Sequence, residues 1–296
     1  MDLEDFMRIT SRDDAGVVEF CREHGLLRKC FHCGSCSRDY STIKWKSDTC
    51  GYVFRCPGCR SKKKLTADTF FDGSKLPIRK LLGLIYMWSY SVAVNTTTAF
   101  LGVSSATVVQ WYQYCRDICS WQLLEEPLRL GGPEKIVQID ESLLVRAKYN
   151  RGRQLRAQQR WVFGIYDPST KEGYIELVPD RSAETLLPII QRIVVPGTEI
   201  WSDEWAAYRP LGSLGYRHAT VNHSKHFKDP ATGTCTNHVE AYWNAVKRTF
   251  KKMFGTTAEM VPSYLDEHMW RERHGRTGHM AFLSIIRHIA RRYRVD

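Results

Sequence analysis

The sequence has no long apolar segment and no recognisable targeting segment at its start. Its longest apolar run, Leu81 to Val94, is shorter than the roughly 20 residues that a bilayer-spanning helix needs. The first nineteen residues carry six acids and two bases, which excludes a signal or transit peptide because these begin with basic or acid-poor segments. We therefore expect a soluble intracellular protein without a membrane partner.

Acidic residues are scarce relative to basic ones. The 296 residues contain 32 Asp and Glu against 43 Lys and Arg, which gives a formal net charge of +11. Such an excess favours polyanionic partners, nucleic acid first among them. Because 43% of the residues are hydrophobic and 12% aromatic, the chain is not disordered, and its length allows about two domains.

Cysteine is scarce outside one stretch, since seven of the ten cysteines lie between Cys21 and Cys59. This uneven placement in a long chain without a secretory signal favours metal binding over a disulfide framework. Two Cys-x-x-Cys pairs separated by a short hairpin typically hold four thiolates around zinc. Cys56 and Cys59 form the second pair.

The first pair has two possible registers, because Cys30 with Cys33 and Cys33 with Cys36 are both spaced correctly. We prefer Cys30 and Cys33, since Gly34 directly after them suits a tight turn in which backbone amides donate to sulfur. The sequence thus predicts a zinc ribbon over residues 21–72 with one structural Zn²⁺. Residues 1–20 form a separate acidic segment with no assigned role.

The predicted zinc ribbon is strongly basic. From Arg22 to Lys64 eleven bases stand against three acids, a net charge of +8, with aromatic residues between them. This pattern favours contacts with DNA phosphates, although a solvated basic face is the alternative. The residues expected to bind DNA here are Lys44, Lys46, Arg55, Arg60, Lys62, Lys63 and Lys64.

Residues 73–130 have a helical pattern. A helix over 76–90 is followed by a short helix over 96–101, a turn at Gly102 and a helix over 106–121. This order predicts a helix-turn-helix, although many helical hairpins share it without touching DNA. Bases would be read near the start of the last helix. The residues expected to read them are Ser104, Ser105, Thr107 and Gln110.

Glycines and a proline at 131–133 mark a change to alternating strand patterns, and we place a catalytic domain with C-terminal helices over 131–296. Its helices are expected over 182–194 and 237–253. The order predicts an α/β fold, a mixed five-stranded sheet with flanking helices that matches a ribonuclease H-like domain. The expected strands cover 135–144, 158–166, 172–178, 199–203 and 217–222.

Three acids occupy positions that such a sheet would use for chemistry. Asp140 lies within the first strand, Asp203 ends the fourth, and Glu240 lies in the first turn of the long helix. A buried charge is costly unless it is paired or binds metal, and such carboxylates can hold two Mg²⁺ or Mn²⁺ ions. Each acid also has a structural explanation, since Asp203 can cap the next segment and Glu240 suits a helix start. Glu141 and Glu204 are the neighbouring alternatives, with Glu141 on the opposite strand face.

Other polar residues could support this site. Asn222 and His223 could position a phosphate or move a proton, and Lys247 could neutralise a phosphate, although such residues often have only structural roles. A basic arm between the first two strands could grip DNA, or could be a solvated loop. The arm residues are Arg146, Lys148, Arg151, Arg153 and Arg156.

The chain resembles the Merlin superfamily of eukaryotic DNA transposons and its bacterial insertion-sequence relatives over most of its length. The stretches that carry the resemblance are FFDGSKLPIRKLLGLIYMW, QIDESLL, WSDEWAAY, VNHSKHF and TNHVEAYWNAVKR. The resemblance implies a cut-and-paste transposase with an acidic triad at Asp140, Asp203 and Glu240. Such an enzyme would bind terminal inverted repeats, cleave them with two Mg²⁺ ions and transfer the 3′-hydroxyls to target DNA.

This resemblance also implies a nuclear location, and two transposon ends call for two active sites and hence a homodimer. Two other functions remain open on the sequence. One is a domesticated DNA-binding protein without catalysis, which the intact acids argue against. The other is a ribonuclease H-like nuclease without strand transfer.

Overall fold

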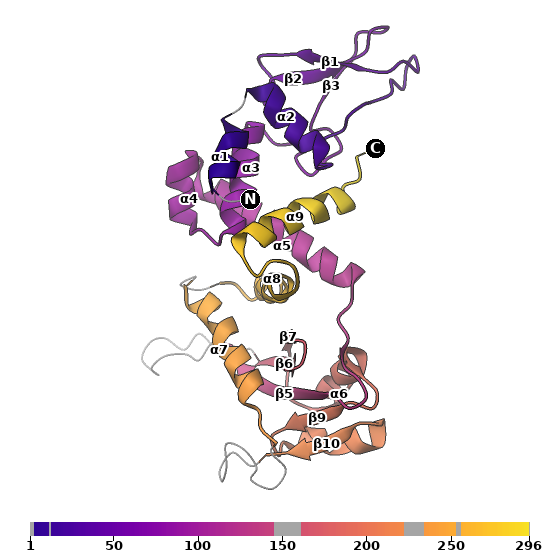
Figure 1. Cartoon of the computed structure of the whole chain (residues 1–296), viewed down its shortest axis with the longest axis vertical. Coiled ribbons are helices and arrows are strands. Elements are labelled where there is room, and N and C mark those ends of the chain that lie inside the picture. The colour runs from indigo at the N-terminus through magenta and orange to yellow at the C-terminus, as the bar shows by residue number, and fades with distance from the viewer. Residues whose placement is uncertain (1–2, 12, 145–160, 222–233, 253–255, 296) are drawn as a thin grey trace. The chain divides into compact units, whose positions relative to one another are not determined.

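The computed structural model describes residues 3–11, 13–144, 161–221, 234–252 and 256–295. The chain divides into two compact units (Figure 1). The helical unit comprises Met1–Gln122 with His274–Asp296, and the sheet unit comprises Leu123–Arg273. Among the described residues, no helix combines the length and apolar character needed to cross a membrane.

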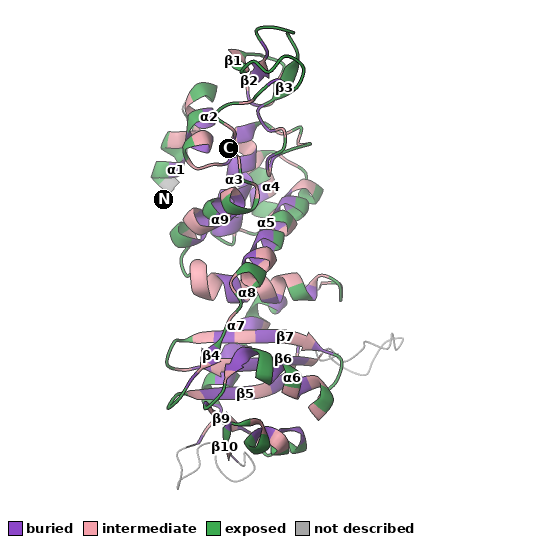
Figure 2. Ribbon diagram, turned by 90° about the vertical axis from the view of Figure 1, so that its right-hand side faces the viewer, coloured by how far each residue is buried: buried purple, intermediate pink, exposed green. Residues whose placement is uncertain are grey.

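The helical unit is organised around an apolar helix, α3, whose leucines and isoleucines are buried (Figure 2). The Tyr86 ring of α3 stacks on Phe6 at 4.0 Å and meets Phe282 edge-on at 5.5 Å, so α3 joins the first and last helices. A small antiparallel sheet precedes α3. The elements of this unit are α1 (Leu3–Thr10), α2 (Asp14–Glu23), β1 (Ser41–Lys44), β2 (Tyr52–Arg55), β3 (Lys62–Lys64), α3 (Ile78–Ser89), α4 (Val94–Leu101), α5 (Ser105–Glu125) and α9 (Gly278–Arg292).

Helices α4 and α5 are joined by a short turn. Gly102 ends α4 with a left-handed backbone (φ 57°), a conformation that glycine adopts without steric cost. The Ser104 hydroxyl then accepts the Thr107 amide at 3.2 Å and begins α5. A hydrogen bond of 2.8 Å between the hydroxyls of Thr97 and Tyr112 holds the two helices together.

The sheet unit is built on five strands in the spatial order β10-β9-β5-β6-β7 (Figure 1). The first three strands in sequence pair antiparallel, and β9 and β10 continue the sheet parallel to β5. The mixed α/β sheet expected from the sequence is therefore confirmed. The strands are β5 (Ile136–Leu143), β6 (Trp161–Asp167), β7 (Glu172–Val178), β9 (Glu199–Ser202) and β10 (Arg217–Thr220).

Separate hydrophobic cores cover the two faces of this sheet. One core packs β5 and β6 against α6 (Ala183–Ile193) and the 3-10 helix η1 (Ala206–Leu214). The short parallel pair β4 (Leu130–Gly131) and β8 (Val194–Val195) adds to this side. The other core lies under the two helices that follow β10. These helices are α7 (Asn237–Lys252) and α8 (Val261–His274).

Two glycines let α7 lie close to the sheet. A Cβ atom at Gly164 would stand 2.5 Å from the Trp243 ring, and one at Gly173 would collide with Tyr242. Both aromatic residues are buried in the core beneath α7. Because Gly164 pairs with Asp140 across the sheet, the Trp243 ring is brought against the centre of the sheet.

The C-terminal helix differs in position from the sequence-based domain division. We expected the catalytic domain to extend to residue 296, whereas α9 packs on α3 in the helical unit. Its buried face, which includes Phe282, Ile285 and Ile289, supplies apolar surface that this unit would otherwise lack. The sheet unit ends at Arg273.

Candidate active site and cysteine cluster

Asp140 lies in the middle of β5 on the face covered by α7. The indole N–H of Trp243 donates to its Oδ2 at 3.1 Å. Since Trp243 sits one turn after Glu240 on the same helix, this bond connects the strand bearing one acid with the helix bearing another. The Trp243 side chain is thus both buried and a hydrogen-bond donor.

Asp203 and Glu240 reach the neighbourhood of Asp140 from different elements. Asp203 directly follows β9, which is parallel to β5, so the carboxyl ends of both strands point to the same edge. Its Oδ1 accepts the backbone N–H of Trp205 at 3.0 Å, the capping contact foreseen as a structural role. In the first turn of α7, Glu240 accepts the hydroxyl of Thr236 at 3.1 Å.

The electrostatic state of Asp140 shows that the three acids influence one another. Burial first, together with the charges of Asp203 and Glu240, raises the pKa of Asp140 to about 7. Hydrogen bonds from the Glu141 backbone and from Trp243 act in the opposite direction. Oxygen donors that repel one another in this way suit a hard divalent cation. The carboxylate oxygens of the three acids are not all within 4.8 Å of one another. Among the described residues, the sulfurs of four cysteines do reach this spacing.

The neighbouring acids occupy other environments. Glu141 lies on the opposite face of β5, where it accepts the Tyr208 hydroxyl and faces Arg181 at 3.8 Å. Burial, followed by the charges of Asp140 and Asp203, raises the pKa of Glu141 to about 8. Glu204 is exposed. The face assignment made from strand alternation therefore agrees with the contacts of Asp140 and Glu141.

Gln138 is a residue of this region that the sequence analysis missed. From β5, its side-chain oxygen accepts the backbone N–H groups of His238 and Val239 at 2.9 and 3.1 Å. Amides in the first turn of a helix have no carbonyl acceptor within that helix. The Gln138 side chain in β5 accepts these two hydrogen bonds and therefore caps the N-terminus of α7. A buried amide within the strand pattern of QIDESLL was the signal that could have revealed it.

Lys247 lies two turns after Glu240, and its ammonium donates to the Ser142 hydroxyl at 2.5 Å. It therefore belongs to the same α7–β5 contact as Trp243. The other expected support residues, Asn222 and His223, lie outside the described residues, as does the basic arm. The arm residues in question are Arg146, Lys148, Arg151, Arg153 and Arg156.

The cysteines in the helical unit converge in a different register from the expected one. The sulfurs of Cys33, Cys36, Cys56 and Cys59 all lie within 4.8 Å of one another. Cys30, which we expected to be a ligand, is exposed and lies outside this cluster, and Cys36 lies at the place expected for it.

Two turns of equal geometry explain this register. In the first, the Cys33 amide donates to the Arg38 carbonyl and the Ser37 amide to the Cys33 carbonyl, at 2.9 and 2.8 Å. The second turn repeats both bonds from Cys56 and Arg60. Ser37 and Arg60 follow the second cysteine of each pair and have positive φ angles of 54° and 63°. We had expected glycine at this place, and Gly34 misled the assignment because serine and arginine occupy it instead.

The surroundings of Cys33 favour its thiolate. The Ser35 backbone amide, with further help from Cys59 and Cys36, lowers the pKa of Cys33 to about 5. Four thiolate donors at this spacing fit the tetrahedral coordination of Zn²⁺. By contrast, burial raises the pKa of Cys50 to about 12, which fits an inert core thiol.

The small sheet beside the cysteines exposes cations that rest on aromatic rings. The ammonium of Lys62 lies 3.4 Å from the centre of the Trp45 ring, and that of Lys63 lies 3.9 Å from the centre of Phe31. Among the expected DNA-binding residues, Arg55 and Thr107 are half-buried. The exposed ones are Lys44, Lys46, Arg60, Lys62, Lys63, Lys64, Ser104, Ser105 and Gln110.

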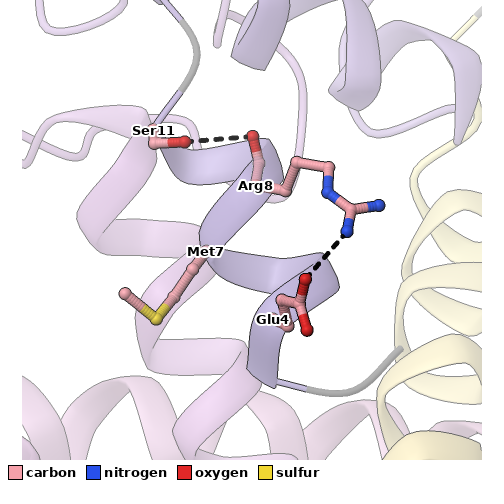
Figure 3. Close-up of a pocket in the computed structure, with 4 residues that line it drawn as sticks. All are labelled: Glu4, Met7, Arg8 and Ser11. Carbon is pink, nitrogen blue, oxygen red and sulfur yellow. Dashed lines mark hydrogen bonds and ion pairs between the residues drawn. The ribbon is translucent and has the colours of Figure 1, made fainter.

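A surface pocket on α1 is unrelated to these sites. It is lined by Glu4, Met7, Arg8 and Ser11, with an ion pair of 3.1 Å between Arg8 and Glu4 (Figure 3). All four side chains are exposed, and they come from α1 and the residue that follows it. The pocket therefore has no set of polar groups converging from several elements, which a site for chemistry requires.

Comparisons with known proteins agree on the sheet unit. A family model described as an ISXO2-like transposase domain matches residues 129–273, which contain the five strands and all three acids. An uncharacterized transposase-like protein of Haemophilus influenzae is 34% identical over 98 residues, which cover 33% of this chain and 78% of that protein.

Two further matches are more distant. The male abnormal protein mab-31 of Caenorhabditis elegans is 23% identical over 208 residues, which cover 64% of this chain and 46% of that protein. This chain thus spans less than half of that relative. Among solved structures, the HTLV-2 integrase catalytic core domain in complex with magnesium is similar with a TM-score of 0.32 and 15% identity. That similarity covers 47% of this chain and 86% of the integrase chain.

Proposed function

Because this chain belongs to the ISXO2-like transposase family, we propose that it is a DNA transposase that acts through Asp140, Asp203 and Glu240. One observation carries the proposal. Both other acids raise the pKa of Asp140, and the helix bearing Glu240 also donates to Asp140 through Trp243. Acids brought together from a strand, a loop and a helix indicate a site for a cation rather than three unrelated structural roles. The strand order supports the ribonuclease H-like form of this chemistry.

The three carboxylates would hold Mg²⁺ or Mn²⁺, with two ions in each site. Such ions activate a water molecule as the nucleophile and stabilise the leaving oxygen of a phosphodiester. The protein supplies the positions of the carboxylates. Trp243 holds Asp140, the Trp205 amide holds Asp203, and Thr236 holds Glu240. Lys247, together with Asn222 and His223, is proposed to contact the phosphate.

The helical unit would bind the DNA ends. We propose that the cysteine cluster holds one Zn²⁺, which makes the basic sheet a rigid contact for phosphates. Helix α5 would enter the major groove with its first two turns, where Ser105 and Gln110 are exposed. The arm between β5 and β6 would add further phosphate contacts.

A Merlin-type transposase implies wider assignments. It would recognise terminal inverted repeats, join the freed 3′-hydroxyls to target DNA and work in the nucleus. Because two ends must be cut and joined together, the active form would be at least a homodimer. These assignments are supported by the sequence motifs and by membership of a transposase family.

A cleavage experiment tests the proposal. Labelled DNA carrying the ends that flank the gene is incubated with the full chain and Mg²⁺, and cutting and joining are measured separately. Asp203→Asn is compared with Glu204→Gln, since the two changes remove one charge at adjacent positions. We expect Asp203→Asn to lower cleavage by about 10²- to 10³-fold, in line with the loss of one preorganised electrostatic group, and Glu204→Gln to keep it.

Each of the other possible results would change the assigned residues or the assigned function. Full cleavage by Asp203→Asn would overturn the assignment of the acids. If the wild-type chain binds the ends without cutting them, it is a DNA-binding protein without catalysis. Cleavage without joining would identify a nuclease.

A further inference from the structure

A chain of contacts connects the strand of Asp140 with the loop of Asp203 on the face of the sheet away from α7. It begins at Glu141, whose side chain is 2% exposed and faces the guanidinium of Arg181 at 3.8 Å. Arg181 belongs to the connection between β7 and α6. None of the proposed steps at the carboxylates uses these two residues.

The guanidinium of Arg181 lies between two indole rings. Its central carbon is 4.2 Å from the centre of the Trp161 ring and 4.3 Å from that of the Trp205 ring. A planar cation stacked on both sides and facing a buried carboxylate is held in one orientation. Lysine could supply the charge but not the stacking.

Trp205 carries the connection onward to Asp203. Its indole N–H donates to the Arg181 carbonyl at 3.0 Å, while its backbone N–H donates to Asp203 Oδ1 at 3.0 Å. Asp203 lies between the end of β9 and the start of η1, so no regular element fixes its carboxylate. The Ser202 hydroxyl donates to the Asp203 carbonyl at 2.6 Å, and the Trp205 side chain anchors the other end of this loop.

We propose that Arg181 and Trp205 are positioning residues that set the Asp203 carboxylate opposite Asp140, so that both can bind the same divalent cation. This inference rests on the proposed function. Residues that orient metal ligands without touching the metal commonly change its affinity when they are removed. Loss of the Trp205 side chain would release the loop that carries Asp203 without removing any of the three acids from the chain.

The matched control is a second Arg-aromatic-Glu cluster in the sheet unit. Arg192 on α6 pairs with Glu176 and lies 5.8 Å from the centre of the Tyr174 ring. The Arg192 side chain contacts Tyr174 and Glu176 and is not part of the chain of contacts from Glu141 to Asp203. Arg192→Ala therefore removes the same kind of side chain from the same unit without loosening the Asp203 loop.

The test measures metal binding apart from activity. Mn²⁺ binding to the full-length chain is followed by the electron paramagnetic resonance of free Mn²⁺, and the binding of Asp140→Asn is subtracted as background. We expect Arg181→Ala and Trp205→Ala to weaken Mn²⁺ binding about ten- to a hundredfold, the range found for residues behind metal ligands. Trp205→Phe, which keeps a ring for stacking but loses the indole donor, should fall between, and Arg192→Ala should bind as the wild type does.

DNA affinity and folding complete the design. Fluorescence anisotropy with end DNA should give unchanged binding for all variants, and circular dichroism should show that each variant remains folded at the temperature of the binding measurements. The inference is overturned if Arg181→Ala and Trp205→Ala bind Mn²⁺ as the wild type does. It is also overturned if they lose DNA affinity with metal binding intact, because the residues would then be DNA contacts. If the wild-type chain itself binds no Mn²⁺ above background, the proposed function fails instead.

Discussion

The four cysteines of the helical unit and the three carboxylates of the sheet unit are held by different means. The cysteines come from two turns with matching hydrogen bonds, and their sulfurs lie within 4.8 Å of one another. The acids come from a strand, a loop and a helix, and Asp140 and Glu240 are a hundred residues apart in sequence. One site is made by local turns and the other by the topology of the sheet.

The pKa values of Cys33 and Asp140, one residue from each site, are shifted in opposite directions. Backbone amides favour the thiolate of Cys33 and lower its pKa, whereas burial and neighbouring acids disfavour the carboxylate of Asp140 and raise its pKa. A local turn can therefore prepare its own negative charge. A site assembled across a sheet gathers charges that need a cation to neutralise them.

The largest effect is expected at the cysteine cluster and tests which four cysteines bind zinc. Cys36→Ser should abolish binding of one Zn²⁺ and unfold the small sheet, because binding of a structural zinc contributes about 10–16 kcal/mol of apparent free energy. Cys30→Ser is the control and should retain one zinc. Metal analysis after dialysis, with proteolysis of the hairpin, measures both, and zinc lost from Cys30→Ser alone would restore the register that we have rejected.

A smaller effect concerns how topology positions the acids. Gly164→Ala places a methyl group against the Trp243 ring and should lower the free energy of unfolding by about 1–3 kcal/mol, the usual cost of overpacking. Gly212→Ala is the control, since no atom lies within 4 Å of its added Cβ. Urea unfolding of the two variants gives the comparison. Equal stability would mean that the close approach of α7 does not constrain the sheet.

The helix cap supplied by the sheet should contribute less. Gln138→Ala leaves the amides of His238 and Val239 without their acceptor and should cost about 0.5–2 kcal/mol, as the loss of other N-caps does. Gln191→Ala, on the exposed side of α6, is the matched control. Urea unfolding measures the loss, and a Gln138→Ala variant as stable as Gln191→Ala would contradict the capping role.

The smallest expected effect is a fall in the free energy of unfolding of the sheet unit as the pH is lowered. Burial, with the charge of Arg271, lowers the pKa of His268 to about 4 from 6.5. Above pH 6.5 the ring is neutral in the folded and the unfolded chain and adds no pH dependence. Between pH 6.5 and 4 only the unfolded chain takes up the proton, so the free energy of unfolding falls, by about 1 kcal/mol at pH 6. His268→Gln should flatten this slope in urea unfolding measured from pH 7.5 to 5, and an unchanged slope would rule out His268 as its source.

Much of the sheet unit could be predicted from the sequence because strand alternation and helical periodicity are strong there. The five strands and α6 and α7 lie within a few residues of their expected bounds. The places of the three acids in β5, after β9 and in the first turn of α7 could be predicted from the same patterns, whereas their role in catalysis stays a prediction. Elements whose patterns are weak were missed, among them α1, α2, η1 and α8.

The finer features of both sites depended on contacts that a single sequence does not encode locally. The cysteine register was decided by which turn bonds form around Cys33, and serine and arginine adopt the φ angles that we assigned to glycine. Gln138 and Trp243 act across about a hundred residues of chain. Such partners can be known only after the sheet and helix have been placed together.

The sequence distances within the two sites also imply an order of assembly during synthesis. The four cysteines lie within 27 consecutive residues of the chain and close a short loop, so this part can fold soon after it leaves the ribosome. The carboxylates meet only when α7 has been made and has docked on β5, a contact of high sequence separation that forms slowly. A nascent chain of this protein can therefore form the two cysteine turns before the three acids proposed for catalysis are brought together.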